Sequence, residues 1–140
     1  MKHVALSFAL CLFLLFNAQA QNKTNDSAAI QATVRNYIEA YYTGDAPRMQ
    51  ATLHPHYLKH MIHGTIPMRE WTGAQMVDSV RSQGPADMAA AQKTEQISVM
   101  DIAGDIASAK LVTPGWVDYM TLQKVNGDWK ILSVVQRIDD

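Results

Sequence analysis

The second half of the chain alternates between apolar and polar residues in four runs separated by short turn signals. The runs span residues 93–103, 106–113, 116–125 and 128–138, and the turns are Gly104-Asp105, Pro114-Gly115 and Asn126-Gly127. Alternation with a period of two is typical of strands that bury one face, and Asn-Gly is the strongest short hairpin signal. The pattern predicts a four-stranded antiparallel meander.

Counting outward from two-residue turns predicts the register, in which Ala109 faces Met120 and Leu122 faces Ile131. One face is then apolar except for an acid and a serine: Met100, Ile102, Ala107, Ala109, Leu111, Asp118, Met120, Leu122, Trp129, Ile131, Ser133 and Val135. The opposite face is mixed: Ile97, Val99, Asp101, Lys110, Val112, Val117, Tyr119, Thr121, Gln123, Lys130, Leu132, Val134 and Gln136. A slip of one residue would exchange the faces, so the sorting supports this register. We expect the first face to pack against helices.

The first half of the chain carries helical patterns. A first helix is expected from Asp26 or Ser27 to Thr43-Gly44, with its apolar stripe at Ile30, Val34, Tyr37, Ile38 and Tyr41. A short second helix is expected between Asp45 and Pro55, with Met49 and Leu53 facing inward. A third helix is expected from a Thr72–Gln75 capping box to Gly84-Pro85, with its stripe at Met76, Val77 and Val80.

A weak hairpin is expected between the second and third helices, with strands at residues 57–62 and 65–71. Pro67 makes the second of these an edge strand, because proline cannot donate a hydrogen bond to a neighbour. The order of elements predicts an α+β fold. Its curved antiparallel sheet consists of the meander plus the hairpin, and three helices cover its concave face to form a cone with a pocket. Residues 27–140 form this single domain.

The first twenty residues read as a signal peptide that precedes the domain. A basic start at Lys2-His3 and an apolar run from Val4 to Phe16 lead to Ala18-Gln19-Ala20, a small-residue pattern before a cut ahead of Gln21. Residues 21–26 are polar and are expected to form a disordered leader. These features predict an exported protein, periplasmic or secreted, with no membrane attachment once the signal is removed.

The composition of the chain bears on disulfide bonds and on nucleic-acid binding. Cys11 is the single cysteine and lies within the signal, so the mature chain can form no disulfide. Without residues 1–20, which contain one lysine, 11 basic and 13 acidic residues remain, a formal net charge of −2. Because the sequence has no basic patch with interleaved aromatic residues, we expect no nucleic-acid partner.

The chain resembles the nuclear transport factor 2-like superfamily, and within it the SnoaL-like and "putative lumazine-binding" proteins. The resemblance covers residues 28–138 and rests on the order and spacing of five segments. They are 37–45 (Tyr37 to Asp45), Leu53-His54-Pro55, 104–107 (Gly104 to Ala107), 117–122 (Val117 to Leu122) and 126–131 (Asn126 to Ile131). This fold hosts isomerases, cyclases, dehydratases and non-catalytic binding or assembly domains, so the resemblance implies a fold more strongly than an activity.

Ketosteroid isomerase-like members of the superfamily use a carboxylate base beside a tyrosine and a protonated acid. By this resemblance Asp118 could act as the general base, with Tyr37 or His60 as the polarising donor. A second inward acid is missing, since Asp101 falls on the opposite face. The alternative for Asp118 is a structural role, in which it bonds to a helix end, Tyr37 or Arg35.

Aromatic residues and a methionine are candidates for lining a ligand pocket, although such residues more often fill a core. They are Tyr41, Trp71, Trp116, Met120 and Trp129. His54, His56, His60 and His63 lie close together in sequence, but on a strand they do not converge, so we expect no metal site. No motif for a cofactor is present, and none is expected.

The first hypothesis for function is an exported domain that binds a small, largely apolar molecule without a cofactor. The second is an isomerase or cyclase that uses Asp118 as its base, and the third is a non-catalytic dimerisation module. The mixed face of the meander, with Val112, Val117, Tyr119, Leu132 and Val134, is too apolar for a solvated surface. Members of the resembled superfamily pair through this face, which implies a homodimer.

Overall fold

The computed structural model describes the backbone of residues 2–139 and the side chains of residues 21–139. Its helices are α1 (Lys2–Thr43), α2 (Ala46–Thr52) and α3 (Gly73–Gln83), with a 3-10 turn η1 (Ala90–Gln92). Its strands are β1 (Leu53–His63), β2 (Ile66–Thr72), β3 (Gln96–Ala103), β4 (Ile106–Thr113), β5 (Trp116–Val125) and β6 (Asp128–Ile138). This order confirms the predicted succession of helix, short helix, hairpin, helix and meander.

The six strands form one curved sheet in the order β2-β1-β6-β5-β4-β3. The meander is antiparallel, and β2 is an edge strand, as Pro67 predicted. The α+β class is confirmed, but the prediction of a wholly antiparallel sheet is wrong, because β1 pairs with β6 in parallel. Turn chemistry specifies pairing within each hairpin, whereas the β1–β6 pairing joins segments far apart in sequence and carries no local signal.

The predicted register holds at both pairs used to define it, Ala109 with Met120 and Leu122 with Ile131. Two bulges interrupt it elsewhere, one between Val99 and Asp101 on β3 and one opposite Thr121 and Leu122 on β6. An extra residue reverses the alternation beyond it. Met100, Ser133 and Val135 therefore do not belong to the buried face as predicted. Instead, Ile97, Val99, Val134 and Gln136 face the helices.

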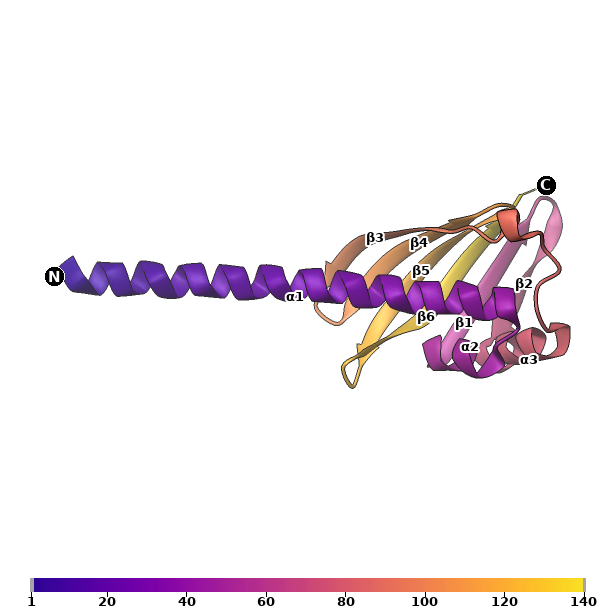
Figure 1. The fold of residues 1–140 in the computed structure, drawn as a ribbon, viewed down its shortest axis with the longest axis horizontal. Coiled ribbons are helices and arrows are strands. Elements are labelled where there is room, and N and C mark those ends of the chain that lie inside the picture. Colours follow the sequence, from indigo (N-terminus) through magenta and orange to yellow (C-terminus); the bar gives the residue numbers. More distant parts are fainter. Residues whose placement is uncertain (1, 140) are drawn as a thin grey trace.

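The helix α1 lies along the concave face of the sheet, and its N-terminal half extends beyond the sheet edge (Figure 1). It begins well before the predicted start and includes residues 21–26, so the structure shows helix where we expected a disordered leader. Residues 2–43 contain neither glycine nor proline, and nothing in the local sequence stops the helix. Asp26 consequently lies within the helix and does not cap it. The predicted signal peptide stays a prediction.

The other helices follow their predicted caps. The side chain of Asp45 accepts a hydrogen bond from the backbone of Arg48, and Thr72 and Gln75 form the predicted capping box of α3. The stripe Met76, Val77 and Val80 is buried. Leu53 was expected to lie in the second helix, but α2 ends at Thr52 and Leu53 begins β1. The core lies between α1, α3 and the concave face of the sheet.

Candidate functional site

A pocket of about 290 Å³ opens between α1, α3 and the concave side of the sheet. Its walls are mainly aromatic and aliphatic, and it also contains a lysine and an acid. The lining residues are Tyr37, Ile38, Tyr41, Lys59, Met61, Trp71, Met76, Ser79, Gln83, Trp116, Asp118, Gln136 and Ile138. The rings of Tyr41 and Trp116 meet edge to face at 5.7 Å, which holds α1 against β5.

The polar part of the pocket is a buried group on three elements. Asp118 on β5 is 0% exposed, and Lys59 on β1 is 5% exposed. The strand β6 lies between β1 and β5, so these side chains approach one another across it, with Lys59 Nζ 3.9 Å from Asp118 Oδ1. Lys59 Nζ also donates to the hydroxyl of Tyr37 at 3.2 Å, and the Tyr37 and Tyr57 hydroxyls lie 3.3 Å apart.

Asp118 is incompletely satisfied. Neither of its carboxylate oxygens has a hydrogen-bond partner among the described residues. The side chains of Gln136 and Trp116 come near enough to favour the charged carboxylate, but neither reaches it with hydrogen-bond geometry. Most buried polar groups in proteins are paired, so an exception beside a cavity indicates a place for a ligand.

Burial favours the neutral forms of Asp118, Lys59 and Tyr37. It raises the pKa of the Asp118 carboxyl, and the nearby Lys59 offsets part of that shift. It lowers the pKa of Lys59, and Asp118 offsets part of that shift in turn. Burial also raises the pKa of Tyr37 well above its usual value, so this hydroxyl keeps its proton and can donate it in a hydrogen bond. The arrangement can therefore bind a polar group or move a proton.

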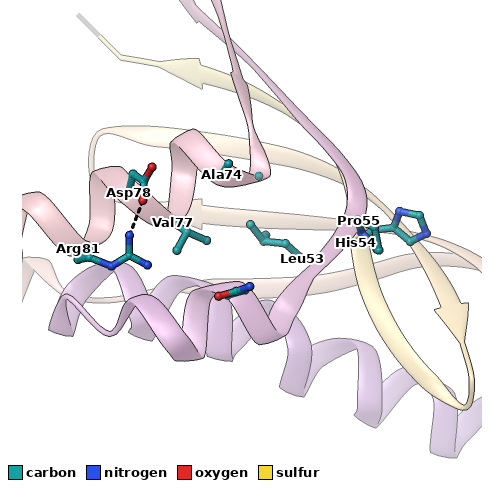
Figure 2. A pocket seen from close by; sticks show the side chains of 9 residues that line it. Leu53, His54, Pro55, Ala74, Val77, Asp78 and Arg81 are labelled. Carbon is teal, nitrogen blue, oxygen red and sulfur yellow. Dashed lines mark hydrogen bonds and ion pairs between the residues drawn. The ribbon is translucent and has the colours of Figure 1, made fainter.

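A second hollow of about 490 Å³ lies on the other side of α3, next to α2 and the start of β1. Figure 2 shows Asp78 and Arg81 paired on α3 beside it, with Val77 and Leu53 nearby. The paired side chains are 70% and 60% exposed, so they are solvated. This hollow is larger, but it lies away from Lys59 and Asp118 and its charges already satisfy one another. We therefore locate the candidate site in the smaller pocket.

The sequence of residues 25–136 matches the profile of a family described as "Putative lumazine-binding". The chain belongs to this putative lumazine-binding family. The match covers most of the chain and includes the strands that carry Lys59 and Asp118. No curated protein matches the chain in sequence.

Solved structures similar to this member of the family share its fold. A nuclear transport factor 2-like protein of unknown function from Silicibacter pomeroyi has a TM-score of 0.69 and 20% identity, covering 84% of this chain and 98% of the other. A ketosteroid isomerase-like protein from Erwinia carotovora atroseptica has a TM-score of 0.58 and 16% identity, covering 82% and 97%. A "putative dehydratase" of the same superfamily from Streptomyces avermitilis has a TM-score of 0.55 and 15% identity, covering 84% and 99%. The predicted superfamily is confirmed.

The structure brings together five of the residues that the sequence singled out. Tyr37, Tyr41, Trp71, Trp116 and Asp118 all line the pocket of this family member. They come from α1, β2 and β5, which meet only in the folded chain.

Three other candidates lie elsewhere. His60 sits on the opposite face of β1, where its Nε2 is 3.0 Å from a carboxylate oxygen of Glu70, so its predicted place in the pocket is wrong. Met120 packs in the core, and Trp129 donates its indole proton to Asp26 at 3.0 Å, so neither lines the pocket. The buried face of β1 carries Tyr57, Lys59 and Met61, and His60 points the other way. The physical reason is that both faces of this strand alternate apolar and polar residues, so period alone does not distinguish them.

Lys59 is a site residue that the sequence did not indicate. It lies between Tyr57 and Met61 on the buried face of β1. A lysine in a strand is ordinarily solvated, and no local signal marks this one as buried. Gln136 was placed on the outer face and enters the pocket because of the bulge on β6.

Over residues 21–139, no group of three or more histidine, cysteine, aspartate or glutamate side chains is arranged to hold a metal ion. His54 and His56 have neighbouring rings 5.6 Å apart, whereas His60 is paired with Glu70. Within the part of the chain whose side chains are described, no helix is both long and apolar enough to cross a membrane.

Proposed function

We propose that the protein binds a small, largely apolar molecule whose polar group meets Asp118, Lys59 and Tyr37. The observation that carries this proposal is the Asp118 carboxylate, which is fully buried beside a cavity and whose two oxygens have no hydrogen-bond partner among the described residues. A ligand hydroxyl or N–H group would supply the missing hydrogen bond. Apolar walls with a few convergent polar groups are typical of small-molecule sites, and the family description is of a small-molecule binder.

Tryptophan fluorescence tests this proposal, because two of the three tryptophans line the pocket and Trp129 does not. Cinnamyl alcohol is a suitable probe, since it joins an apolar body to one hydroxyl group. We expect it to change the emission of the wild-type protein and of Trp129→Phe. The change should be smaller in Trp116→Phe and in Trp71→Phe.

The same titration tests the role of Asp118. Asp118→Asn keeps the size of the side chain and removes its charge, so affinity should fall roughly ten- to a hundredfold if a ligand donates to the carboxylate. Unchanged affinity in Asp118→Asn, or an emission change that survives in both pocket variants, would contradict binding at this site.

A second candidate function is proton transfer at carbon, with Asp118 as the general base and Tyr37 as the donor that polarises a ligand carbonyl. The observation that favours it is that the fully buried Asp118 lines the same pocket as Tyr37. Burial raises the pKa of Asp118, which brings the carboxylate closer to the strength needed for such a base. Deuterium exchange at the carbon next to the carbonyl of a bound ketone, followed by NMR, would measure it. Exchange should disappear in Asp118→Asn; exchange at the wild-type rate in that variant would exclude this role.

We also propose that the protein is exported. Support comes from the basic start, the apolar run and Ala18-Gln19-Ala20 before Gln21. Asp26, which bonds to Lys124 and Trp129, follows the predicted cut, so these links to the sheet would remain in the mature chain. Mass spectrometry of protein recovered from the periplasm or medium should find Gln21 at the N-terminus. Recovery of the chain only from the cytoplasm, with Met1 or Lys2 at its start, would count against export.

A further inference from the structure

Lys59 is a buried lysine among the residues that line a largely apolar pocket. A buried ammonium loses its hydration, which costs free energy unless partners replace the water. Among the described residues, its hydrogen bond is to the Tyr37 hydroxyl at 3.2 Å, and the Asp118 oxygen at 3.9 Å is beyond hydrogen-bond range. A lysine that served only to neutralise Asp118 would be expected to bond it directly. Lys59 instead lines the cavity together with Asp118 and Tyr37.

We propose that Nζ of Lys59 is a nucleophile that forms an imine with the carbonyl carbon of a small, largely apolar aldehyde or ketone in this pocket. This inference rests on the proposed function, because the carbonyl compound must first bind there. Lysine amines that form imines are commonly activated by removal from water and by a neighbouring acid or base. Lys59 meets both conditions, with 5% exposure and Asp118 3.9 Å away.

The reaction balances without any outside reagent. An amine attacks a carbonyl through its lone pair, so the ammonium proton of Lys59 first passes to the Asp118 carboxylate. Burial favours this neutral pair, because it lowers the pKa of Lys59 and raises that of Asp118. The Nζ–C bond then forms while the carbonyl π electrons move to oxygen. That oxygen leaves as water with one proton from the amine and one from Asp118, which leaves a protonated imine beside a carboxylate.

The groups near Lys59 suit this step. Tyr57 lies two residues earlier on the buried face of β1, and Tyr37 on α1 accepts the lysine's hydrogen bond. Asp118 on β5 is 3.9 Å away, and Gln136 on β6 lines the same pocket. Tyr37 keeps its proton, because burial raises its pKa, so its hydroxyl can donate to the carbonyl oxygen as charge develops there. Apolar walls exclude water, which would otherwise hydrolyse the imine. The Asp118 carboxylate therefore faces a cation both before and after the reaction: first the Lys59 ammonium, then the protonated imine.

Reductive trapping tests the proposal on the full-length protein. Cinnamaldehyde and sodium cyanoborohydride convert any imine to a stable secondary amine, and peptide mass spectrometry locates it. We expect Lys59 to be modified at least tenfold faster than Lys110 and Lys130, which lie outside the pocket. Cinnamyl alcohol, which has the same apolar body without a carbonyl, should slow the modification of Lys59 only.

Variants separate this inference from the proposed function. Lys59→Met should lose the fast modification, and Lys110→Met on the outer face should keep it. Asp118→Asn retains the lysine without the acid, so modification of Lys59 should be at least tenfold slower in that variant, with circular dichroism confirming that it folds. If wild-type Lys59 reacts no faster than Lys110 while cinnamyl alcohol still changes the fluorescence, the imine is wrong and binding stands. If neither occurs, both proposals fail.

Discussion

At the scale of single residues, the sequence pattern indicates Asp118 as a candidate site residue but does not indicate Lys59. Asp118 interrupts an otherwise apolar set of alternate positions in the meander, and this isolation marked it as a candidate. Lys59 lies in a strand whose two faces are about equally apolar, so nothing local distinguished it from His60. The chemistry of either residue depends on the other, because each charge is buried and the nearest opposite charge is its partner.

Removing one charged side chain of this pair should lower the free energy of unfolding more than removing both. Lys59→Met leaves a buried carboxylate without its cation, and the free energy of unfolding at neutral pH should fall by about 3–5 kcal/mol. The double variant Lys59→Met with Asp118→Val removes both charges and should be more stable than Lys59→Met alone. Chemical denaturation of the three proteins measures this, and a double variant less stable than the single one would show that the pair is not coupled.

At the scale of secondary structure, the link between α1 and the sheet depends on Asp26. Its carboxylate accepts hydrogen bonds from Lys124 Nζ at 2.6 Å and from the indole of Trp129 at 3.0 Å. Thr33 adds a hydrogen bond to the backbone oxygen of Trp129 at 3.1 Å. These contacts attach the helix near the β5–β6 turn, the end of the sheet away from the pocket. They explain why Trp129 is buried without lining the ligand site.

Asp26→Asn should lower stability in a pH-dependent way. The hydrogen bond from Lys124, followed by that from Trp129, holds the pKa of Asp26 below its ordinary value of 3.8. A lowered pKa in the folded state gives stability that is present above the unfolded-state pKa and lost as pH falls through the folded-state pKa. Thermal unfolding should therefore separate the variant from the wild type at pH 7 and not at pH 2. Asp105→Asn, on an exposed turn, is the control; a difference independent of pH would contradict a charge effect.

The end of α1 meets the end of α3 at two glycines. Gly44 and Gly84 both have positive φ, but a Cβ atom at Gly44 would overlap the backbone of Gly84, whereas one at Gly84 meets nothing within 4 Å. Gly84→Ala should cost about 1–2 kcal/mol from its backbone conformation alone. Gly44→Ala should cost a further 1–3 kcal/mol, roughly, because the two helix ends must separate. Equal losses in denaturation experiments would show that the close approach is unimportant.

At the scale of the whole molecule, the outer face of the sheet is mixed but exposes several large apolar side chains. Tyr119 and Val135 pair across β5 and β6, and they are 48% and 44% exposed. Ile62, on β1, is 42% exposed. Exposed apolar side chains on neighbouring strands indicate an interaction surface more strongly than single ones do. We propose, as the sequence pattern also implied, that a second copy of the chain covers this face.

Charged substitutions on that face should weaken self-association. Tyr119→Lys combined with Val135→Lys places like charges on adjacent strands, so sedimentation velocity at micromolar concentration should change from dimer to monomer. Met100→Lys, on the edge strand β3, is the control and should leave the dimer intact. A monomeric wild-type protein under these conditions would contradict the proposal.

Local sequence patterns determine much of this fold. Several features depend on residues that are near one another in sequence. They are the three hairpin turns, the meander register at Ala109 and Leu122, and the Thr72 capping box. Short-range chemistry is sufficient for such features, since turn geometry and capping involve a few neighbouring backbone groups. The superfamily and the candidate role of Tyr37 came from the resemblance of five segments to that superfamily, whereas Asp118 was indicated by its isolation on an apolar face.

Tertiary structure alone decided the parallel pairing of β1 with β6 and, through it, the position of Lys59 opposite Asp118. The two residues are far apart in the chain, and a strand with two similar faces can present either one to a core. Which face is buried depends on the neighbour that the strand finds, and that choice minimises the free energy of the whole sheet and its covering helices. For the same reason, the bulge on β6 brought Gln136 into the pocket and left Val135 outside it.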